Sequence, residues 1–391
     1  TVEVNLKFPA AAFMSYFANN YTSIRQKEYS ETGVDYKLVE NVLGSGAFRL
    51  KEYQKDVSME YVKNPDYWKE GLPYLDGMKY FIIRNGAASF AAYKAGQTMM
   101  SVSMVSVMPN SDAFQLATET EDRGTVYWDG PASVVQIHLH NHKEPFTNKL
   151  VKKAMLLATY RQPLIELLTK GRATLGYPLP PGFWFAPTNE EVAQMPGFRE
   201  LNGEKHPDDL AEAKALMAEA GFPDGFKTQV LAPTTLDPKE VALIWSDQMR
   251  RSLNIEIEVD ITESNVAVER RLSGDFLTYS HSDGLAVHDP DDMFTRSFIT
   301  GSSHNRINRG DVPPRIGELH DLQTRELDRE TRKALANEAA EIMLDDLPLI
   351  PLYWVERWMY LDNRIKNFNI HQSAYGQIYK WEHIWCDPAC S

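Results

Sequence analysis

Two neighbouring segments decide the fold assignment: Gly44-Ser-Gly-Ala-Phe-Arg-Leu-Lys-Glu-Tyr53 and, after it, Asn64-Pro-Asp-Tyr-Trp68. The two glycines permit a turn that leads into a strand, which we predict over 48–53, because glycine lacks a Cβ that would restrict its backbone. Asn-Pro-Asp is typical of a turn, and the adjacent aromatic pair supplies apolar surface that can cover the end of a sheet. These features are structural, so they indicate a scaffold and leave the ligand open.

Helical and strand-like patterns alternate on both sides of this segment, which is typical of an α/β protein. Apolar residues at helical spacing, bounded by capping residues, proline or glycine, predict helices over 87–94, 147–158 with Thr147 as the N-cap, 207–221, 237–249 and 328–344. Strand-like runs cover 48–53, 58–62, 78–83, 134–139, 227–231 and 255–261. Strict alternation predicts a further strand over 1–7, and we expect that the chain was cut within it.

Composition and charge exclude several classes of protein. The 391 residues include 17 Phe, 8 Trp and 18 Tyr, which rules out a disordered chain, and the length suggests two or three domains. The net charge of −13 repels phosphate, so we expect no nucleic-acid partner. No apolar run approaches the roughly 20 residues of a membrane span. The sequence therefore predicts a soluble, globular, acidic protein.

The two cysteines, Cys386 and Cys390, lie close together near the end of the sequence. Two thiols cannot supply the four ligands of a structural zinc site. They form either one small-loop disulfide, which would indicate an oxidising compartment, or two free thiols in a frayed tail.

Motifs that carry catalysis or bind phosphate are missing from the sequence, so we predict that the protein is not an enzyme and uses no cofactor. The sharpest metal-like feature is the alternating series His138, His140 and His142. On a strand these side chains share one face, and two of them could chelate an ion. The alternative, which we favour, is that the imidazoles simply pack at the end of the strand, so no metal site is predicted.

Further motifs extend the opening segment in a recognisable order: Leu72-Pro-Tyr-Leu-Asp-Gly77, Ala92-Tyr-Lys-Ala-Gly-Gln97, the helix that begins after Phe146, Glu212-Ala-Lys-Ala-Leu-Met-Ala-Glu-Ala-Gly221 and Leu347-Pro-Leu-Ile-Pro-Leu-Tyr353. In order and spacing they resemble the family 5 extracellular solute-binding proteins, the dipeptide and oligopeptide receptors of ABC importers. The resemblance covers most of residues 40–360.

The resemblance implies a two-lobed α/β periplasmic-binding-protein fold of type II, from the large cluster with an extra subdomain. It assigns 1–40 to a remnant of the extra subdomain, 41–128 to lobe I, 129–348 to lobe II and 349–391 to the return into lobe I and the tail. Members of the family are longer, so lobe I is expected to be incomplete at its N-terminal side.

The same resemblance implies the function. We expect the substrate-binding component of an ABC importer, which binds a peptide or peptide-like solute reversibly and delivers it to a membrane permease. A monomer is expected, in the periplasm or outside the cell in association with the membrane. The alternatives are a receptor of the same fold for an oligosaccharide or a metal chelate, and a metal-dependent hydrolase that uses His138 and His140.

Ligand in this family lies in a cleft between the lobes, and the resemblance places Asp289 where peptide receptors have an acid that pairs with the amino group of the peptide. The alternative is that Asp289 starts a turn or caps the following helix. Tyr279, Ser282 and Asp283 are expected to line the approach. Arg296 would meet a ligand carboxylate or form a surface ion pair.

Two tryptophans complete the candidate site. Trp184 lies in the loop Pro180-Pro-Gly-Phe-Trp-Phe185, which resembles the proline-rich cleft loop of the family. We predict that it stacks on the ligand, and the alternative is a local hydrophobic plug. Trp128 precedes the strand at 134–139 and contacts ligand or packs the hinge.

Overall fold

The computed structural model describes residues 3–19, 22, 24–35, 38–101, 108–299, 313–346, 349–369, 380–387 and 390 of the chain. Contacts between residues divide the protein into two compact units. The larger unit consists of Gly130–Glu356 and the N-terminal residues up to Phe17. The smaller unit consists of Ala18–Asp129 and the described residues from Arg357 onward. The chain thus passes from one unit to the other more than once, and each unit is described by itself below.

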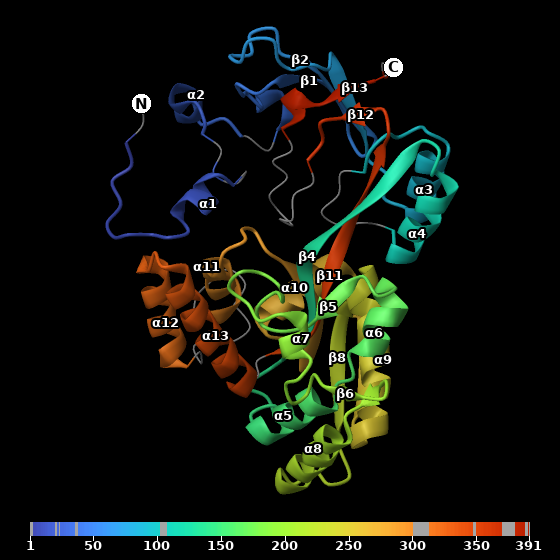
Figure 1. Ribbon diagram of the computed structural model, residues 1–391, viewed down its shortest axis with the longest axis vertical. Coiled ribbons are helices and arrows are strands. Elements are labelled where there is room, and N and C mark those ends of the chain that lie inside the picture. Colours follow the sequence, from blue (N-terminus) through green and yellow to red (C-terminus); the bar gives the residue numbers. More distant parts are fainter. Residues whose placement is uncertain are drawn as a thin grey trace. The chain divides into compact units, whose positions relative to one another are not determined.

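A six-stranded mixed sheet forms the centre of the larger unit, in the order β5-β11-β4-β10-β8-β9 (Figure 1). The strands are β4 (Gly124–Leu139), β5 (Ala173–Leu175), β8 (Lys227–Pro233), β9 (Glu256–Thr262), β10 (Thr278–Gly284) and β11 (Leu349–Asp362). β8 runs parallel to β9 and β10, whereas β10 is antiparallel to β4 and β5 is antiparallel to β11. The pairing of β10 with β4 sets Tyr279 opposite His138.

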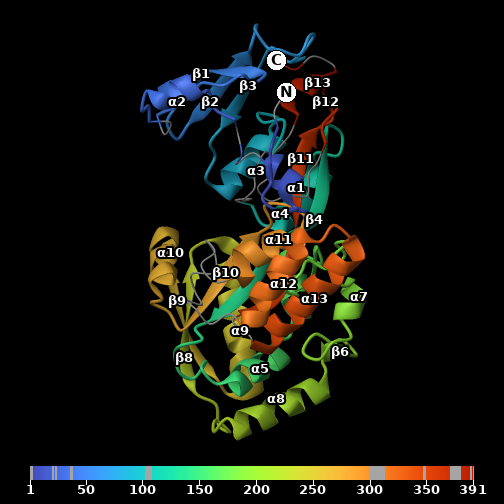
Figure 2. The same cartoon turned by 90° about the vertical axis from the view of Figure 1, so that its left-hand side faces the viewer.

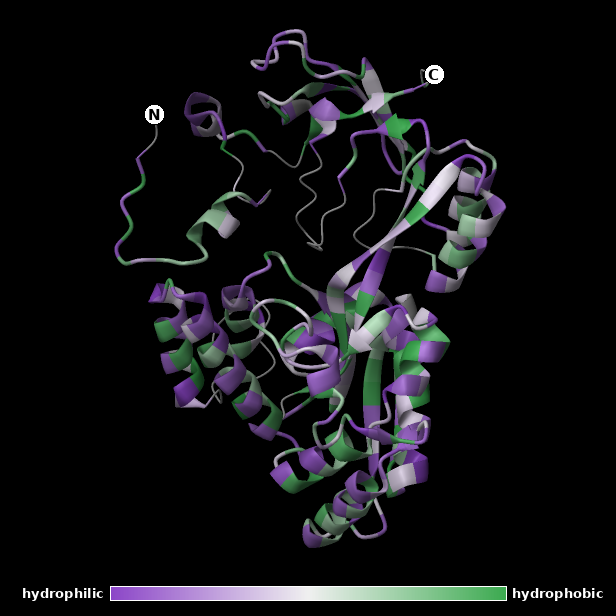
Figure 3. Cartoon of the chain, in the orientation of Figure 1, coloured by the Kyte–Doolittle hydropathy of each residue, from purple (hydrophilic) through white to green (hydrophobic). Residues whose placement is uncertain are grey.

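Helices surround this sheet (Figure 2). The described helices of the larger unit are α1 (Phe13–Phe17), which lies apart from the sheet in Figure 1, α5 (Lys149–Ala158), α6 (Gln162–Leu164), η3 (Ile165–Thr169), α7 (Asn189–Val192), α8 (Pro207–Glu219), α9 (Leu236–Leu253), α10 (Ser264–Ser273), α11 (Pro290–Met293), η4 (Phe294–Phe298), α12 (Pro314–Arg325) and α13 (Arg329–Asp346). A short hairpin is formed by β6 (Glu200–Leu201) and β7 (Glu204–Lys205). Fully buried apolar side chains such as Ile137, Trp245 and Tyr353 fill the space between sheet and helices. The apolar residues of β8 are visible as green in Figure 3.

The smaller unit contains a three-stranded antiparallel sheet in the order β1-β2-β3. Its elements are α2 (Lys27–Glu31), η2 (Val39–Asn41), β1 (Phe48–Gln54), β2 (Ser58–Lys63), β3 (Gly77–Phe81), α3 (Gly86–Lys94), α4 (Asn110–Glu119), β12 (Ile365–Lys366), η5 (Trp381–His383) and β13 (Trp385–Cys386). A second, smaller core of Tyr93, Leu116 and Tyr360 lies between α3, α4 and β11.

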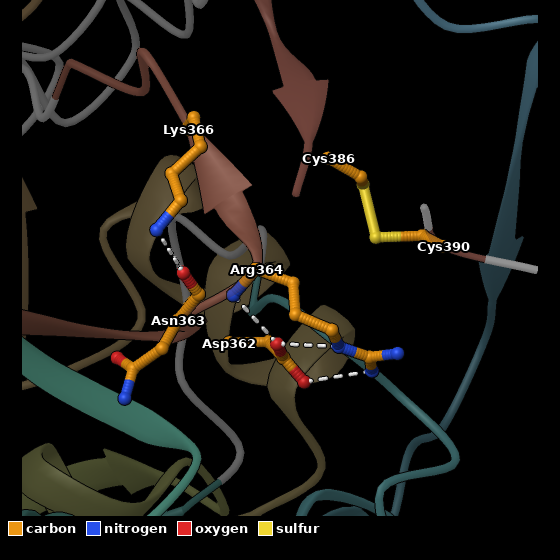
Figure 4. Close-up of a disulfide and its surroundings, with 6 residues drawn as sticks. All are labelled: Asp362, Asn363, Arg364, Lys366, Cys386 and Cys390. Carbon is orange, nitrogen blue, oxygen red and sulfur yellow. Dashed lines mark hydrogen bonds and ion pairs between the residues drawn. A yellow bond between two sulfur atoms is a disulfide. The ribbon is translucent and has the colours of Figure 1, made fainter. Parts of the chain in front are cut away.

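The two cysteines form a disulfide next to the β12–β13 pair (Figure 4). The Cα atoms of Cys386 and Cys390 are 5.6 Å apart, which is an ordinary spacing for a disulfide. Nearby, the guanidinium of Arg364 donates to both carboxylate oxygens of Asp362 at 3.0 Å. Of the two possibilities left open by the sequence, the structure has the disulfide.

Most of the predicted helices and strands are confirmed, because local signals mark their ends. α8, for example, begins at Pro207, whose ring fixes φ near the helical value, and ends before Gly221, which has a φ of 87°. α3, α9, α13, β1, β2, β3, β8 and β9 also lie where the patterns predict them. The sequence also predicts a loop-rich stretch over 301–314, and residues 301–312 of it lie outside the described residues.

Two local predictions are wrong. The strand predicted over 1–7 is absent from residues 3–7, which are exposed and have no partner strand; further along, Ala11 donates its N–H to Thr324 at 2.9 Å. Thr147 does not cap α5, because its hydroxyl donates to Glu144, and the side chain of Asn148 instead accepts from Leu150 at 2.9 Å.

Candidate ligand-binding site

Six of the seven predicted site residues lie in the larger unit. Tyr279, Ser282 and Asp283 are on β10. Asp289 precedes α11 as its N-cap residue, Arg296 lies in η4, and Trp184 lies in the loop between β5 and α7. β10 and the segment after it therefore form the frame of the candidate site. Residues distant in sequence complete it.

Asp289 is buried at the N-terminus of α11 and has two partners. Its side chain accepts the N–H of Asp291 at 3.0 Å, which makes it the N-cap of the helix. Both carboxylate oxygens also accept from Arg332 of α13, at 2.9 and 2.5 Å. The guanidinium of Arg332 lies 5.5 Å from the ring centre of Trp184. Arg332, which sequence reasoning missed, thus joins two predicted site residues and neutralises Asp289.

Trp184 is half-buried between cations and another ring. A second guanidinium, that of Arg329, lies 5.2 Å from its ring centre, and the ring of Phe185 meets it edge-on at 5.4 Å. Cations over an indole face are attracted by its π electrons. Both a stacking surface and a hydrophobic plug fit this arrangement, so the role of Trp184 stays a prediction.

A second cluster of charged side chains lies at the end of β10, where Arg296 is shared by two carboxylates. Its Nη2 is 3.2 Å from Asp283 Oδ1, and its Nη1 is 3.8 Å from Asp292 Oδ2. All three side chains are largely buried, so this is not the surface ion pair that the sequence left open. Burial raises the pKa of Asp292 to about 7, Arg296 opposes this shift, and the nearby Asp283 adds to it.

Asp291 points to different partners. Its carboxylate accepts from Gln323 at 2.7 Å and from Thr324 at 2.8 Å, and His320 lies 3.5 Å away. Burial alone would raise the pKa of Asp291, but the nearby His320 and the hydrogen bonds from Thr324 and Gln323 outweigh it and bring the pKa to about 2. Asp289, Asp291 and Asp292 are close together in the sequence, but each of them therefore binds different partners.

Two side chains of the histidine series, His138 and His140, pack against neighbouring residues. His138 is buried beside Gln136, with 3.1 Å between their Nε2 atoms, and His140 lies against Phe276 with 5.0 Å between ring centres. Within the described ranges, no group of three His, Cys, Asp or Glu side chains is arranged to hold a metal ion. Burial, followed by the nearby His281 and Arg271, lowers the pKa of His138 well below its ordinary value.

Trp128 is the predicted site residue that lies in the smaller unit, on the part of β4 before Gly130. Its ring packs against Phe114 of α4, with 5.1 Å between ring centres. This unit also contains a cavity of about 800 Å³, lined by β3, by residues 96–101 and by Trp358, Trp381 and Trp385. None of the seven predicted residues lines that cavity.

Solved structures of other proteins share this fold. OppA of Haemophilus influenzae, in complex with the peptide RPPGFSPFR, superposes with a TM-score of 0.78 at 20% identity, covering 97% of this chain and 72% of that one. DppA of Helicobacter pylori, in complex with the peptide STSA, gives 0.76 at 22% identity, covering 97% and 71%. The fold is therefore the two-lobed α/β fold of the type II periplasmic binding proteins.

The family follows from the sequence comparison. Residues 1–305 match the middle region of the bacterial extracellular solute-binding proteins, family 5, and the chain belongs to this family. Dipeptide-binding protein DppE of Bacillus subtilis is 23% identical over 388 residues, and Heme-binding protein A of Haemophilus influenzae is 25% identical over 400 residues. Each alignment covers 97% of this chain but only 68% and 67% of the relative. The family suggested by the sequence motifs is thus confirmed.

One further observation concerns membranes. Among the helices in the described part of the chain, none is long and apolar enough to cross a bilayer.

Proposed function

We propose that this protein is the substrate-binding component of a bacterial ABC importer, and that it binds a peptide or peptide-like solute in the periplasm and delivers it to a membrane permease. The dipeptide- and oligopeptide-binding names of its relatives support this class of solute. The disulfide supports an oxidising compartment. Binding without chemical change, by a monomer, is part of the proposal.

The observation that carries the peptide proposal is the sharing of Arg296 by Asp283 and Asp292. When both acids are ionised, the three described side chains Asp283, Asp292 and Arg296 together carry one net negative charge at the end of β10. A peptide ammonium group would satisfy that charge with charge-assisted hydrogen bonds and would favour the ionised form of Asp292. Because Asp289 is already neutralised by Arg332, we propose that Asp289 positions the loop that follows β10. We also propose that Ser282 and Trp184 line the ligand.

The proposal is tested by native mass spectrometry and titration calorimetry with peptides of two to four residues, maltotriose and hemin. Hemin is included because Heme-binding protein A matches as much of the chain as the dipeptide relative does. Peptide binding, weakened by N-acetylation of the peptide, is the expected result. If the protein binds maltotriose or hemin but no peptide, the proposed class of solute is wrong.

A pair of matched variants tests whether Asp283 contacts the ammonium group of the peptide. Asp283→Asn should weaken the binding of peptides with a free amino group by about tenfold, the usual effect of a lost charge-assisted hydrogen bond. Asp275→Asn is the control, because Asp275 pairs with Arg270 on the surface at 3.0 Å. Equal effects of both substitutions would argue against an ammonium contact at Asp283.

A further inference from the structure

The cavity in the smaller unit takes no part in the proposed function. Its volume is about 800 Å³, and pockets for small molecules measure about 300–1,000 Å³. Every residue that lines it belongs to the smaller unit, and none of them is among the residues that we assign to the solute. The cavity is therefore a candidate for a second ligand.

Aromatic rings and thioethers form much of the wall of this cavity. They include Trp358, Trp381 and Trp385, and the methionines Met78, Met99 and Met100. Indole rings offer broad apolar faces on which a flat group can stack. Methionine is flexible and polarisable, so a wall of this kind adapts to the shape of an apolar ligand. These side chains favour a ligand with a bulky apolar body.

The charges along the wall cancel. The charged residues among those that line the cavity are Asp76, Lys79 and Arg364. Arg364 is neutralised by the buried Asp362, to whose carboxylate it donates twice at 3.0 Å (Figure 4). One acid and one base are left. Because an unpaired charge is costly to bury, a wall without net charge favours a neutral ligand.

Two polar side chains of the wall have a buried atom without a hydrogen bond. They are Trp358, which is 8% exposed, and Thr98; within the described part of the chain, Nε1 of the first and Oγ1 of the second have no partner. Native proteins leave few buried polar atoms unpaired. An indole N–H can only donate, whereas a threonine hydroxyl can donate or accept. The group that complements Trp358 is therefore an acceptor, such as a carbonyl oxygen.

Specific contacts fix the walls of the cavity to one another. The N–H of Asp362 donates to the carbonyl oxygen of Met99 at 2.7 Å, and the N–H of Tyr74 donates to the carbonyl oxygen of Glu382 at 3.2 Å. The disulfide at Cys386 ties a further part of the lining. A pocket with walls held in this way is largely formed before its ligand arrives, which lowers the entropic cost of binding.

We propose that this cavity is a second ligand site, and that it takes a neutral, largely apolar small molecule that carries a hydrogen-bond acceptor such as a carbonyl group. The apolar body packs on the indole rings and thioethers. The acceptor binds Nε1 of Trp358, and because this atom is buried, the indole turns to present it. The inference goes beyond the proposed function and does not depend on the identity of the solute.

The central experiment compares three naphthalenes by equilibrium dialysis against the whole chain. The neutral ketone 2-acetylnaphthalene is the probe, 2-ethylnaphthalene lacks the acceptor, and 2-naphthalenesulfonate carries a charge. Wild-type protein should bind the ketone roughly three- to tenfold more tightly than the ethyl compound, the effect of one hydrogen bond. The sulfonate should bind more weakly than the ketone by at least about tenfold, because its charge finds no partner in the wall.

Matched variants locate the probe. Trp358→Phe keeps a ring but removes the N–H, so it should bring the affinities for the ketone and the ethyl compound together. Trp68→Phe is the control, because Trp68 is exposed and does not line the cavity. Met100→Glu places a carboxylate in the wall and should weaken the binding of the ketone by about tenfold. Its control is Met14→Glu, at an exposed position of the larger unit.

Three results would overturn the inference. The first is that wild-type protein binds the ketone no better than the sulfonate, or not at all. The second is a folded Trp358→Phe variant, as judged by circular dichroism, that keeps the preference for the ketone. The third is an equal effect of Met100→Glu and Met14→Glu, and this pair decides the matter if Trp358→Phe does not fold. None of these measurements involves a peptide, so they test the cavity whether or not the proposed solute is right.

Discussion

Arg332 and Asp289 form a two-pronged ion pair between residues 43 positions apart in the chain, with Nη1–Oδ2 and Nη2–Oδ1 distances of 2.9 and 2.5 Å. The exposed fractions of the two side chains are 5% and 9%. Because Asp289 also caps α11, the pair fixes the start of that helix against α13. The buried pair therefore helps to hold the segment that carries Asp291 and Asp292 in place.

Breaking this pair from one side should destabilise the protein strongly. Arg332→Met leaves Asp289 buried without its counter-charge, and such losses cost about 3–5 kcal/mol in the free energy of unfolding. Urea unfolding, followed by circular dichroism, measures the change. Arg315→Met is the control, since Arg315 pairs with Glu338 at 2.7 Å on the surface. A control variant as unstable as Arg332→Met would show that burial of the pair is not what matters.

The pKa of Asp292 predicts a pH dependence of stability. Burial raises it from the ordinary value of 3.8 to about 7, so between these values the folded protein holds a proton that the unfolded chain has released. Stability from this group is fully present below pH 3.8 and falls as pH rises toward 7. Asp292→Asn removes the titration while its amide oxygen can still accept the N–H of Ala286. The variant should therefore gain stability relative to wild type across this range and level off above it.

Denaturant unfolding at several pH values tests this, with about 1.4 kcal/mol expected for each unit of pKa difference. Asp291 does not interfere, because its pKa is lowered to about 2 and its contribution is lost only as pH falls from 3.8 toward 2. Curves for wild type and Asp292→Asn that run parallel from pH 4 to pH 7 would contradict the raised pKa.

The disulfide should stabilise the smaller unit by a modest amount. A bond between residues four apart closes a short loop, for which chain-entropy reasoning gives about 2 kcal/mol. The double variant Cys386→Ser and Cys390→Ser should lose that amount in urea unfolding, and wild type should not react with a thiol reagent until it is reduced. Two titratable thiols in the non-reduced protein would show that the bond does not form.

The sequence could predict those features of the structure that are determined by residues close together in the chain. The ends of α8 follow from Pro207 and Gly221, and the disulfide was one of two possibilities for neighbouring cysteines. The prediction of a strand over 1–7 was wrong because alternating apolar and polar residues indicate a single strand and do not show that a partner strand exists. β10 and its following loop were chosen through family resemblance. Their partner Arg332 was missed, because no sequence pattern links a residue to a contact made only by tertiary packing.

Two glycines that bracket the turn after α8 provide a last, matched prediction. Gly221 and Gly225 both have left-handed backbones, with φ of 87° and 78°. A Cβ at Gly221 would meet no atom within 4 Å, whereas one at Gly225 would lie 2.0 Å from the carbonyl oxygen of Asn254. Gly221→Ala should therefore cost only the backbone penalty of about 1–2 kcal/mol. Gly225→Ala should cost clearly more, because the turn and the end of α9 must move apart. Unfolding free energies that are equal for the two variants would show that the chain relieves this contact without strain.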